Sequence, residues 1–358
     1  LKALRKEIIT RELEIHEALN QDMRKSAFEA MTSETVLVSK ELSLMIKMLP
    51  LWSRVRRAKS SLINFPSKDY IKPEPYGNTL MISPWNYPFQ LAITPLIGAV
   101  AAGNTVVLKP SEYAPHTSVV IKKIITNVFD PGHVSVMEGD AKVATELLKK
   151  RWDFIMFTGS TRVGKIIAKA AAVHLTPTTL ELGGKSPCIV DQSAPIGITA
   201  KRIVWGKFLN CGQTCIAPDY LLVNEKVKSN LVVALIKEIE RAFGKNQKKS
   251  EDYGRIAHED HFKNLKAAIK DEKVIYGAKT EKKSLFFSPT LVESPAKGSM
   301  LMKEEIFGPI LPIITYQDEV EIHHFLKSQE RPLAFYVFSK RNKFINQLFN
   351  RYSFGGGV

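Results

Sequence analysis

The chain has 358 residues, of which 44% are hydrophobic and 24% are charged. This length and composition are typical of a soluble globular protein with room for two domains. The formal net charge is +15, but Lys and Arg are scattered and no segment alternates basic with aromatic residues, so we expect no nucleic-acid partner. Three cysteines are too few for a disulfide scaffold and indicate a reducing, cytoplasmic compartment.

Two features of the chain concern membranes. Residues 75–108 carry no charge, but prolines and asparagines interrupt them, so they predict a buried strand, loop, helix and strand rather than a membrane span. The chain has no secretory signal, does not begin with Met and stops after Val358, which favours a fragment of a longer protein. A membrane anchor in a missing C-terminal tail stays open.

The first half of the chain predicts an α/β domain. Residues 1–60 have apolar positions at helical spacing, and the basic run 54–59 is interpreted as the solvent side of a helix. Strands then alternate with helices, which indicates a parallel sheet covered on both faces. The predicted strands lie at 79–83, 104–108, 134–137, 154–157 and 178–182, and the predicted helices at 89–102, 115–129, 141–150 and 163–173.

A second α/β unit begins near Gly183. Its polar stretch 244–255 predicts a surface loop. The predicted helices lie at 196–210, 227–243, 259–270, 318–328 and 341–350, and the predicted strands at 220–224, 285–292, 310–315 and 333–338. We therefore expect two domains, 1–182 and 183–358.

Residues 159–165 (GSTRVGK) are the first candidate binding site. They follow a predicted strand and open a helix, where glycines let backbone N–H groups approach a phosphate. Ile166 stands where a P-loop needs Ser or Thr, and Thr161 where the dinucleotide fingerprint needs its second Gly. The stretch is therefore either a phosphate loop that fits neither template or a tight turn.

Cys211 and Cys215 lie four residues apart in NCGQTC. They do not predict a zinc site, because the chain has no second cysteine pair and His258 and His261 fall on a predicted surface helix. We expect no metal. Cys215, among small and hydroxyl residues where a helix gives way to a loop, suits an accessible thiolate, and a core thiol is the alternative. Cys188 is interpreted as a buried core thiol.

Two further polar residues are candidates for catalysis. Glu181 lies between two leucines in a strand that ends in two glycines. A carboxylate in such an apolar setting is a candidate general base, and a solvent-facing Glu on an edge strand is the alternative. Asn86 lies between Pro84 and Pro88, in a rigid loop from which its amide could stabilise an oxyanion. A turn-stabilising Asn is the alternative there.

Six motifs together resemble the aldehyde dehydrogenase superfamily, and most closely its class 3 branch of fatty and aromatic aldehyde dehydrogenases. They are SPWNYP (83–88), VLKPSE (107–112), FTGSTRVGK (157–165), LELGGKSP (180–187), GQTCIAPDY (212–220) and EEIFGP (304–309). The resemblance implies a Rossmann-like NAD(P)-binding domain at 1–182, with an oligomerisation excursion near 62–80. It also implies a second α/β domain at 183–358, the catalytic domain, truncated at its C-terminus.

The resemblance also implies catalytic roles. Cys215 matches the family's nucleophile, which forms a thiohemiacetal and then a thioester. Asn86 matches the amide that stabilises the oxyanion together with the Cys215 backbone N–H. Glu181 matches the general base that activates water to hydrolyse the thioester, and Glu305 is a secondary acid/base candidate.

The remaining matches concern the cofactor and the aldehyde. The resemblance places Lys109 and Glu112 at the adenosine ribose, Gly159, Ser160 and Gly164 at the pyrophosphate, Glu305 and Phe307 at the nicotinamide end, and Trp85 and Tyr87 at the aldehyde tunnel. Core packing is an equal interpretation for Trp85. NAD⁺ is favoured over NADP⁺, because the carboxylate of Glu112 would repel a 2′-phosphate, although class 3 enzymes can use both.

The implied function is NAD(P)⁺-dependent oxidation of aliphatic or aromatic aldehydes to carboxylic acids, by a homodimer. Within the fold, the alternative is a CoA-acylating dehydrogenase, which would not need the water-activating Glu181. From another class, the alternative is a P-loop nucleotide-binding protein, against which Ile166 argues. Cys211 could form a disulfide with Cys215 under oxidation and silence the enzyme.

Overall fold

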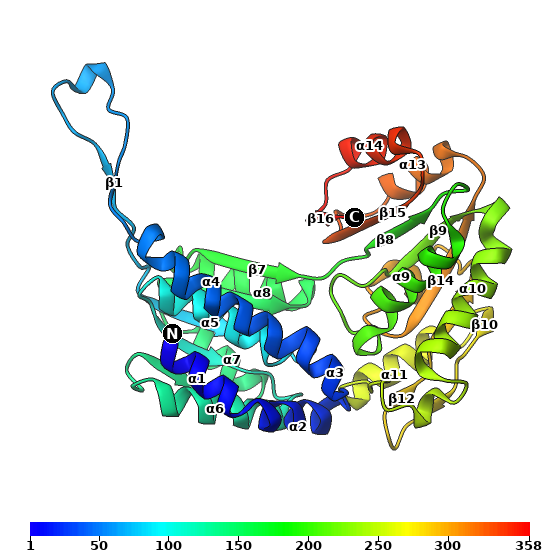
Figure 1. The fold of residues 1–358 in the computed structure, drawn as a ribbon, viewed down its shortest axis with the longest axis horizontal. Coiled ribbons are helices and arrows are strands. Elements are labelled where there is room, and N and C mark those ends of the chain that lie inside the picture. Colours follow the sequence, from blue (N-terminus) through cyan, green and yellow to red (C-terminus); the bar gives the residue numbers. More distant parts are fainter. The chain divides into compact units, whose positions relative to one another are not determined.

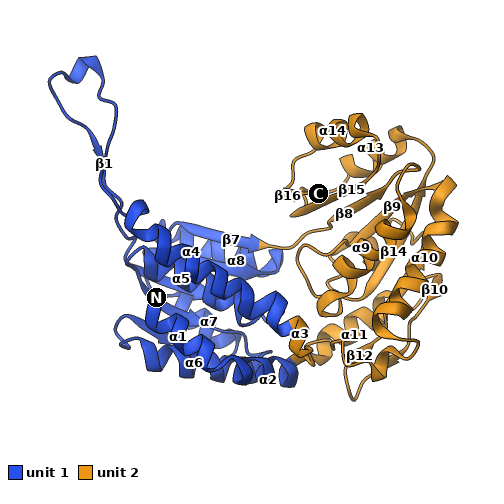
Figure 2. Ribbon diagram, viewed as in Figure 1, with its two compact units in different colours: residues 1–22, 30–181 blue, residues 23–29, 182–358 orange.

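The computed structural model describes every residue of the chain, 1–358. The residues form two compact units, 1–22 with 30–181 and 23–29 with 182–358 (Figure 2). The main division, after residue 181, falls beside the boundary expected from the sequence. No helix has the length and apolar character needed to cross a membrane.

The first unit contains a five-stranded sheet with the order β5-β4-β3-β6-β7 (Figure 1). Strand β3 pairs in parallel with both β4 and β6, and β4 pairs in parallel with β5. The strands are β3 (Asn78–Ile82), β4 (Thr105–Lys109), β5 (Val134–Val136), β6 (Phe154–Gly159) and β7 (Thr178–Leu182). This is a doubly wound order that reverses between β3 and β6, where open α/β sheets bind ligands beyond the carboxyl ends of their strands.

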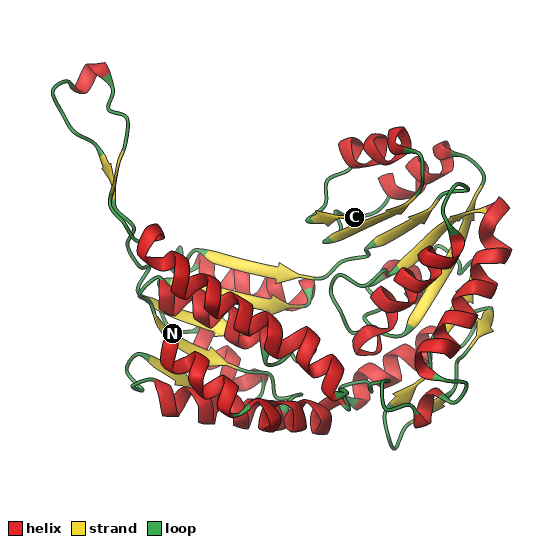
Figure 3. Cartoon of the chain, viewed as in Figure 1, coloured by secondary structure: helices red, strands yellow, loops and turns green.

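Helices cover both faces of this sheet (Figure 3). Right-handed crossovers place the helices between β3 and β5 on one face and those between β5 and β7 on the other. These helices are α5 (Gln90–Ala101), α6 (Pro115–Val128), α7 (Ala141–Leu148) and α8 (Thr161–Ala172). Apolar side chains of α1 (Lys2–Thr10), α2 (Glu12–Met23) and α4 (Val36–Trp52) join α5, α6 and the sheet in one buried core.

The basic run at 54–59 is not helical, so that sequence interpretation is wrong. Helix α4 ends at Trp52, and β1 (Arg56–Arg57) pairs antiparallel with β2 (Tyr70–Ile71) in a hairpin (Figure 1). A further bond runs from the Ala58 N–H to the Asp69 carbonyl, at 2.8 Å. A helix through this run would have no apolar face to bury, whereas pairing across the hairpin satisfies the backbone and leaves the cations in water.

The second unit contains a seven-stranded sheet with the order β10-β13-β14-β9-β8-β15-β16, in which only the β10–β13 pair is antiparallel. The strands are β8 (Pro187–Val190), β9 (Tyr220–Asn224), β10 (Val274–Tyr276), β13 (Thr290–Glu293), β14 (Ile310–Tyr316), β15 (Ala334–Phe338) and β16 (Gly356–Gly357). Strand β8 was not predicted. It is only four residues long and begins with Pro, so its sequence pattern is weak.

Helices cover both faces of the second sheet as well. Successive strand residues point into different cores: Leu221 packs with α9 and α10, whereas Leu222 packs with α13 and α14. The helices are α9 (Ile196–Phe208), α10 (Glu225–Phe243), α11 (Glu259–Ala268), α13 (Glu319–Lys327) and α14 (Asn342–Arg351). Burial on both faces explains why these strands are continuous apolar runs.

Residues 23–29, which include most of α3 (Ala27–Ala30), belong to the second unit although they lie near the N-terminus. The Arg255 N–H donates to the Met23 carbonyl at 2.9 Å, and Arg24 donates to the Lys248 carbonyl at 3.0 Å. Both acceptors are backbone carbonyls, which no side-chain pattern announces, so the sequence did not predict this excursion.

Candidate active site

The candidate residues of the first unit gather at the carboxyl edge of its sheet. In the register of β3, Ile82 lies beside Lys109 of β4 and Phe157 of β6. The loop that carries Asn86 follows β3, and Ser160 follows β6. Because parallel strands end at the same edge, this register brings together segments far apart in the sequence, at the position where such sheets bind ligands.

The stretch 159–165 is a strand-to-helix turn with free helical N–H groups at its start. Helix α8 begins at Thr161, two residues earlier than predicted, so Ser160 is its N-cap and its hydroxyl accepts from the Val163 N–H at 3.4 Å. A Cβ on Gly159 would lie 2.5 Å from the Phe157 ring, so a larger residue there would have to displace that ring. The helix dipole and the remaining N–H groups fit the pyrophosphate of a dinucleotide.

Lys109 and Glu112 form an ion pair at the end of β4. The Lys109 side chain is 3% exposed, and its Nζ lies 2.7 Å from Glu112 Oε2. It also donates to the Pro110 carbonyl at 3.1 Å. Two groups predicted at the adenosine ribose therefore lie together, with the cation largely neutralised.

The loop with Asn86 is held rigidly. Asn86 and Tyr87 are buried, at 3% and 8% exposure, and Trp85 is half-buried. Helix α5 starts soon after the loop, and the buried carboxylate of Glu34 accepts from the N–H groups of Phe89 and Gln90 at 3.1 and 2.7 Å. Glu34, which lies in a short π-helical turn, Met31–Thr35, was not predicted from the sequence.

Glu181 is exposed, so the prediction of an apolar setting is wrong and the edge-strand alternative describes its position. It is the penultimate residue of β7, which is one of the two edge strands of its sheet. The flanking leucines are only half-buried, because an edge strand lacks a neighbour on one side. Its carboxylate can reach solvent water.

Cys215 lies at the amino edge of the second sheet, in the loop before β9. Helix α9 ends at Phe208 rather than extending to 210, because Asn210, Cys211 and Gly212 have φ values of 52°, 55° and 75°. Gln213, fully buried, fixes this loop by donating to the Asn210 and Arg255 carbonyls at 3.0 and 2.9 Å. Beyond Cys215, the Tyr336 hydroxyl donates to the Ile216 carbonyl at 2.6 Å.

The three cysteines differ in exposure. Cys188 and Cys211 are fully buried, whereas Cys215 is half-buried. The prediction that Cys188 is a core thiol is confirmed, and burial raises its pKa well above the usual range. Burial also raises the pKa of Cys211 to about 12, and its Sγ lies 3.3 Å from the Tyr253 hydroxyl. Cys215 is thus the one thiol open to a reactant.

A buried cluster of charges surrounds Glu305. Lys185 forms an ion pair with Asp219 and donates to the carbonyl of Glu304 at 2.9 Å, and Asp219 accepts from the Ile306 N–H at 2.9 Å. These bonds fix the segment on both sides of Glu305. A Cβ on Gly183 would overlap the Glu305 carboxylate, so this glycine leaves it room.

Burial raises the pKa of Glu305 to about 8, and the neighbouring Asp219 carboxylate adds to the rise. Lys207 is 1% exposed, and burial lowers its pKa to about 8, against the attraction of Asp219. Three residues of this cluster were not predicted from the sequence: Lys207, Asp219 and Lys185. A lysine in the apolar helical run IVWGKF, and charges inside two of the quoted motifs, were signals that could have found them.

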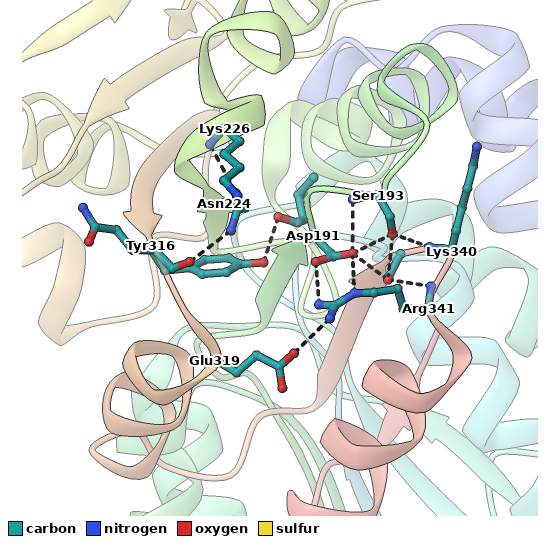
Figure 4. A network of polar contacts seen from close by, with 11 residues as sticks. Asp191, Ser193, Asn224, Lys226, Tyr316, Glu319, Lys340 and Arg341 are labelled. Atoms are coloured by element: carbon teal, nitrogen blue, oxygen red, sulfur yellow. Dashed lines mark hydrogen bonds and ion pairs between the residues drawn. The ribbon is translucent and has the colours of Figure 1, made fainter.

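The opposite, carboxyl edge of the second sheet carries a separate polar cluster (Figure 4). Asp191 follows β8, is 1% exposed, and accepts from Arg341 at 2.7 and 3.1 Å and from the Ser193 hydroxyl at 2.6 Å. Burial alone would raise the pKa of Asp191, but the Arg341 and Ser193 hydrogen bonds lower it to about 2. This cluster is internally satisfied and joins two loops.

No group of three or more His, Cys, Asp or Glu side chains is arranged to hold a metal ion. The two histidines assigned to a surface helix behave differently from that prediction. His258 caps the start of α11, and His261 turns inward, where burial lowers its pKa to about 4.

Comparison with known proteins agrees with this arrangement. The model of the aldehyde dehydrogenase family matches residues 1–357. The chain is 43% identical over 360 residues to the 4,4'-diaponeurosporen-aldehyde dehydrogenase of Staphylococcus aureus, covering 100% of this chain and 78% of that protein. It is 41% identical over 356 residues to the "Aldehyde dehydrogenase, dimeric NADP-preferring" of Canis lupus familiaris, covering 99% and 79%. A solved structure, the substrate-bound state of Staphylococcus aureus AldH, superposes with a TM-score of 0.97 at 43% identity, covering 100% and 78%.

The chain belongs to the aldehyde dehydrogenase family. It is an oxidoreductase that acts on aldehydes with NAD(P)⁺. The resemblance to the class 3 branch, the α/β fold class and the cofactor predicted from the sequence are confirmed, and the CoA-acylating and P-loop alternatives are not favoured.

Proposed function

We propose that Cys215 is the nucleophile in this chain and that Asn86, Glu181 and Glu305 complete its catalytic set. The observation that carries the proposal is the exposure of the thiols: Cys188 and Cys211 are 0% exposed, and Cys215 alone is half-buried. It lies in a loop fixed by the buried Gln213. A nucleophile has to be both reachable and held in place.

The proposed chemistry begins with addition to the aldehyde. The Cys215 thiolate forms a bond to the carbonyl carbon while the C=O π electrons move to oxygen. The Asn86 amide and the Cys215 N–H donate to that oxyanion. NAD(P)⁺, when bound, would supply the hydride acceptor. Loss of hydride from the thiohemiacetal carbon leaves a thioester on Cys215.

Hydrolysis then regenerates the thiol. Water adds to the thioester carbon while a carboxylate removes its proton, and the sulfur leaves as a thiolate. Glu181 suits the base role, because its exposed carboxylate at the sheet edge can reach solvent water. Burial keeps Glu305 protonated up to about pH 8. It is therefore a secondary candidate for proton transfer, and Glu181 is the first candidate for the base.

The experiment separates these roles by mass spectrometry of the intact chain after mixing with aldehyde and cofactor. Cys215→Ala should lose at least about 10⁴-fold in kcat yet still bind NAD⁺. Glu181→Gln should lose about 10²-fold and accumulate an acyl group on Cys215. An acyl adduct elsewhere, or turnover that depends strictly on CoA, would refute the proposal.

The proposed cofactor contacts use the first unit. The N-terminus of α8 with Gly159, Ser160 and Gly164 would hold the pyrophosphate, and Lys109 with Glu112 the adenosine ribose. Support comes from the Ser160 cap and from the missing Cβ at Gly159. Glu305 and Phe307 of the second unit would hold the nicotinamide end. Preference for NAD⁺ over NADP⁺ stays a prediction.

For the substrate we propose aliphatic or aromatic aldehydes, with Tyr87 and Trp85 shaping the tunnel. One relative is named for a long polyene aldehyde, which supports testing long apolar chains as well as benzaldehyde. The test is to measure kcat/KM for a panel of aldehydes of increasing length. A strong preference for small polar aldehydes would contradict this part.

We also propose that the protein is a cytoplasmic homodimer in which the hairpin of β1 and β2 contacts a partner. The hairpin exposes Leu62, Ile63 and Phe65 by 91%, 94% and 81%. A relative is named dimeric, and such exposure is typical of interfaces. Leu62→Asp with Ile63→Asp should convert a dimer to a monomer in light scattering, and an unchanged mass would refute the contact. Fractionation of cells into soluble and membrane parts tests whether the protein is cytoplasmic or whether a longer chain is anchored to a membrane.

A further inference from the structure

The turn at Phe307 and Gly308 has an unusual backbone. Phe307 has φ of +50°, in the left-handed region that a bulky residue rarely adopts. It follows directly on Glu305 and Ile306 and precedes strand β14. Strained residues of this kind persist only where surrounding contacts hold them, and they gather at functional sites.

The imidazole of His261 supplies one such contact. His261 lies in the first turn of α11, and its Nε2 is 2.8 Å from the carbonyl oxygen of Phe307. A carbonyl only accepts, so Nε2 carries the proton and donates it. The two rings also meet edge to face, with centroids 6.3 Å apart and planes at 62°.

His261 is itself fixed and uncharged. The His258 Nδ1, at the N-cap of α11, accepts from the His261 backbone N–H at 3.3 Å. Burial lowers the pKa of His261 to about 4, so near neutral pH the ring is neutral and acts as a hydrogen-bond donor rather than as an acid.

The same turn packs against the cysteine loop. A Cβ on Gly308 would lie 2.7 Å from both methyl groups of Leu265, one turn along α11 from His261. A Cβ on Gly212 would overlap the carbonyl of Gly308. Helix α11, the 307–308 turn and the loop at Gly212, three residues before Cys215, therefore stack in direct contact.

We propose that His261 is a positioning residue: its bond to the Phe307 carbonyl holds the left-handed turn that aims the Phe307 ring at the nicotinamide and supports the Cys215 loop. The inference rests on the proposed function for what Phe307 and Cys215 do. It assigns His261 no contact with substrate or cofactor.

The test compares three variants. His261→Leu puts an apolar side chain in place of the imidazole and removes the donor. His261→Gln offers an amide N–H that can reach the same carbonyl. His324→Leu makes the same change at an exposed histidine of α13 and is the control. If His261→Leu does not fold, His261→Asn replaces it, because its shorter amide falls short of the carbonyl.

Three measurements are made on each variant: the Kd of NAD⁺ from protein fluorescence without turnover, the rate of Cys215 alkylation by iodoacetamide without cofactor, and kcat with KM. We expect His261→Leu to raise the Kd and KM for NAD⁺ about fivefold to tenfold, the effect of one hydrogen bond, and to change the alkylation rate. We expect His261→Gln to remain within about twofold of wild type and His324→Leu to match it.

A merely structural role would lower thermal stability without moving Kd or the alkylation rate, and that result would overturn the inference. So would a His261→Gln variant no better than His261→Leu. Failure of the proposed function looks different: wild type itself would show no acyl-enzyme on Cys215, while the Kd and alkylation comparisons among the variants would still be readable.

Discussion

The Lys109 ammonium lies 2.7 Å from the Glu112 carboxylate at the carboxyl end of β4. This pairing changes what the carboxylate does to a nearby 2′-phosphate, because Lys109 offsets its charge. Glu112→Gln would leave Lys109 without its counter-ion. We expect the ratio of kcat/KM for NADP⁺ to that for NAD⁺ to rise about fivefold, the scale of one charge interaction near a surface.

The control is Glu138→Gln, which breaks a similar pair with Lys122 at 2.6 Å elsewhere in the first unit. It should leave the cofactor ratio unchanged. Steady-state kinetics at constant ionic strength measure both variants, because surface pairs are screened by salt. An equal change of the NADP⁺ to NAD⁺ ratio in both variants would mean that neither carboxylate distinguishes the two cofactors.

Glu305 predicts a pH-dependent stability. Burial raises its pKa from 4.5 to about 8, so its contribution to stability is fully present below pH 4.5 and is lost as the pH rises to about 8. Glu305→Gln removes this titration. The melting temperature of Glu305→Gln relative to wild type should therefore rise by about 2 °C per pH unit across that window and then level off.

Lys207→Met serves as the matched variant. Burial lowers the pKa of Lys207 from 10.5 to about 8, so its contribution is present above pH 10.5 and lost as the pH falls to about 8. Its pH dependence should appear in the alkaline window alone. Calorimetry between pH 5 and 10 tests both, and a flat difference for Glu305→Gln would contradict the burial of its carboxylate.

The Asp191–Arg341 pair is expected to be structural. Asp191→Asn should lower the free energy of unfolding by about 2–3 kcal/mol, because it leaves the Arg341 guanidinium without its buried partner. Hydrogen bonding lowers the pKa of Asp191 from 3.8 to about 2, so this stability is present above pH 4 and lost as the pH falls towards 2. Urea unfolding measures the loss. Cys215 alkylation should stay unchanged, since the cluster lies at the opposite sheet edge.

The fold of the first unit was predictable because its signals are local. Alternating apolar runs and turn glycines, such as Gly159, fix the strands and crossovers, and the carboxyl edge follows from parallel pairing. The setting of Glu181 was not predictable. Leucines on both sides indicate burial, but burial depends on whether β7 gains a second neighbour, which is a property of the sheet order.

The second unit shows a different limit. Its site residues lie in the loops before strands, and the shape of those loops comes from left-handed residues such as Asn210 and Phe307, which are not glycines. A pattern of residue types does not announce such a conformation. The inward position of His261 was missed for another reason. Helical periodicity alone placed it on the surface.

Cys211 carries the last prediction. The spacing NCGQTC suggested a disulfide with Cys215, but the Cys211 Sγ lies in the core, 3.3 Å from the Tyr253 hydroxyl and 3.8 Å from the Phe287 carbonyl. Burial raises its pKa to about 12, which removes the thiolate that exchange requires. Peroxide should therefore inactivate Cys211→Ala at the same rate as wild type. The substitution should lower the free energy of unfolding by about 1–2 kcal/mol. Peptide mapping after peroxide tests this, since a disulfide between Cys211 and Cys215 within their common peptide would show that the loop opens far enough to expose the buried thiol.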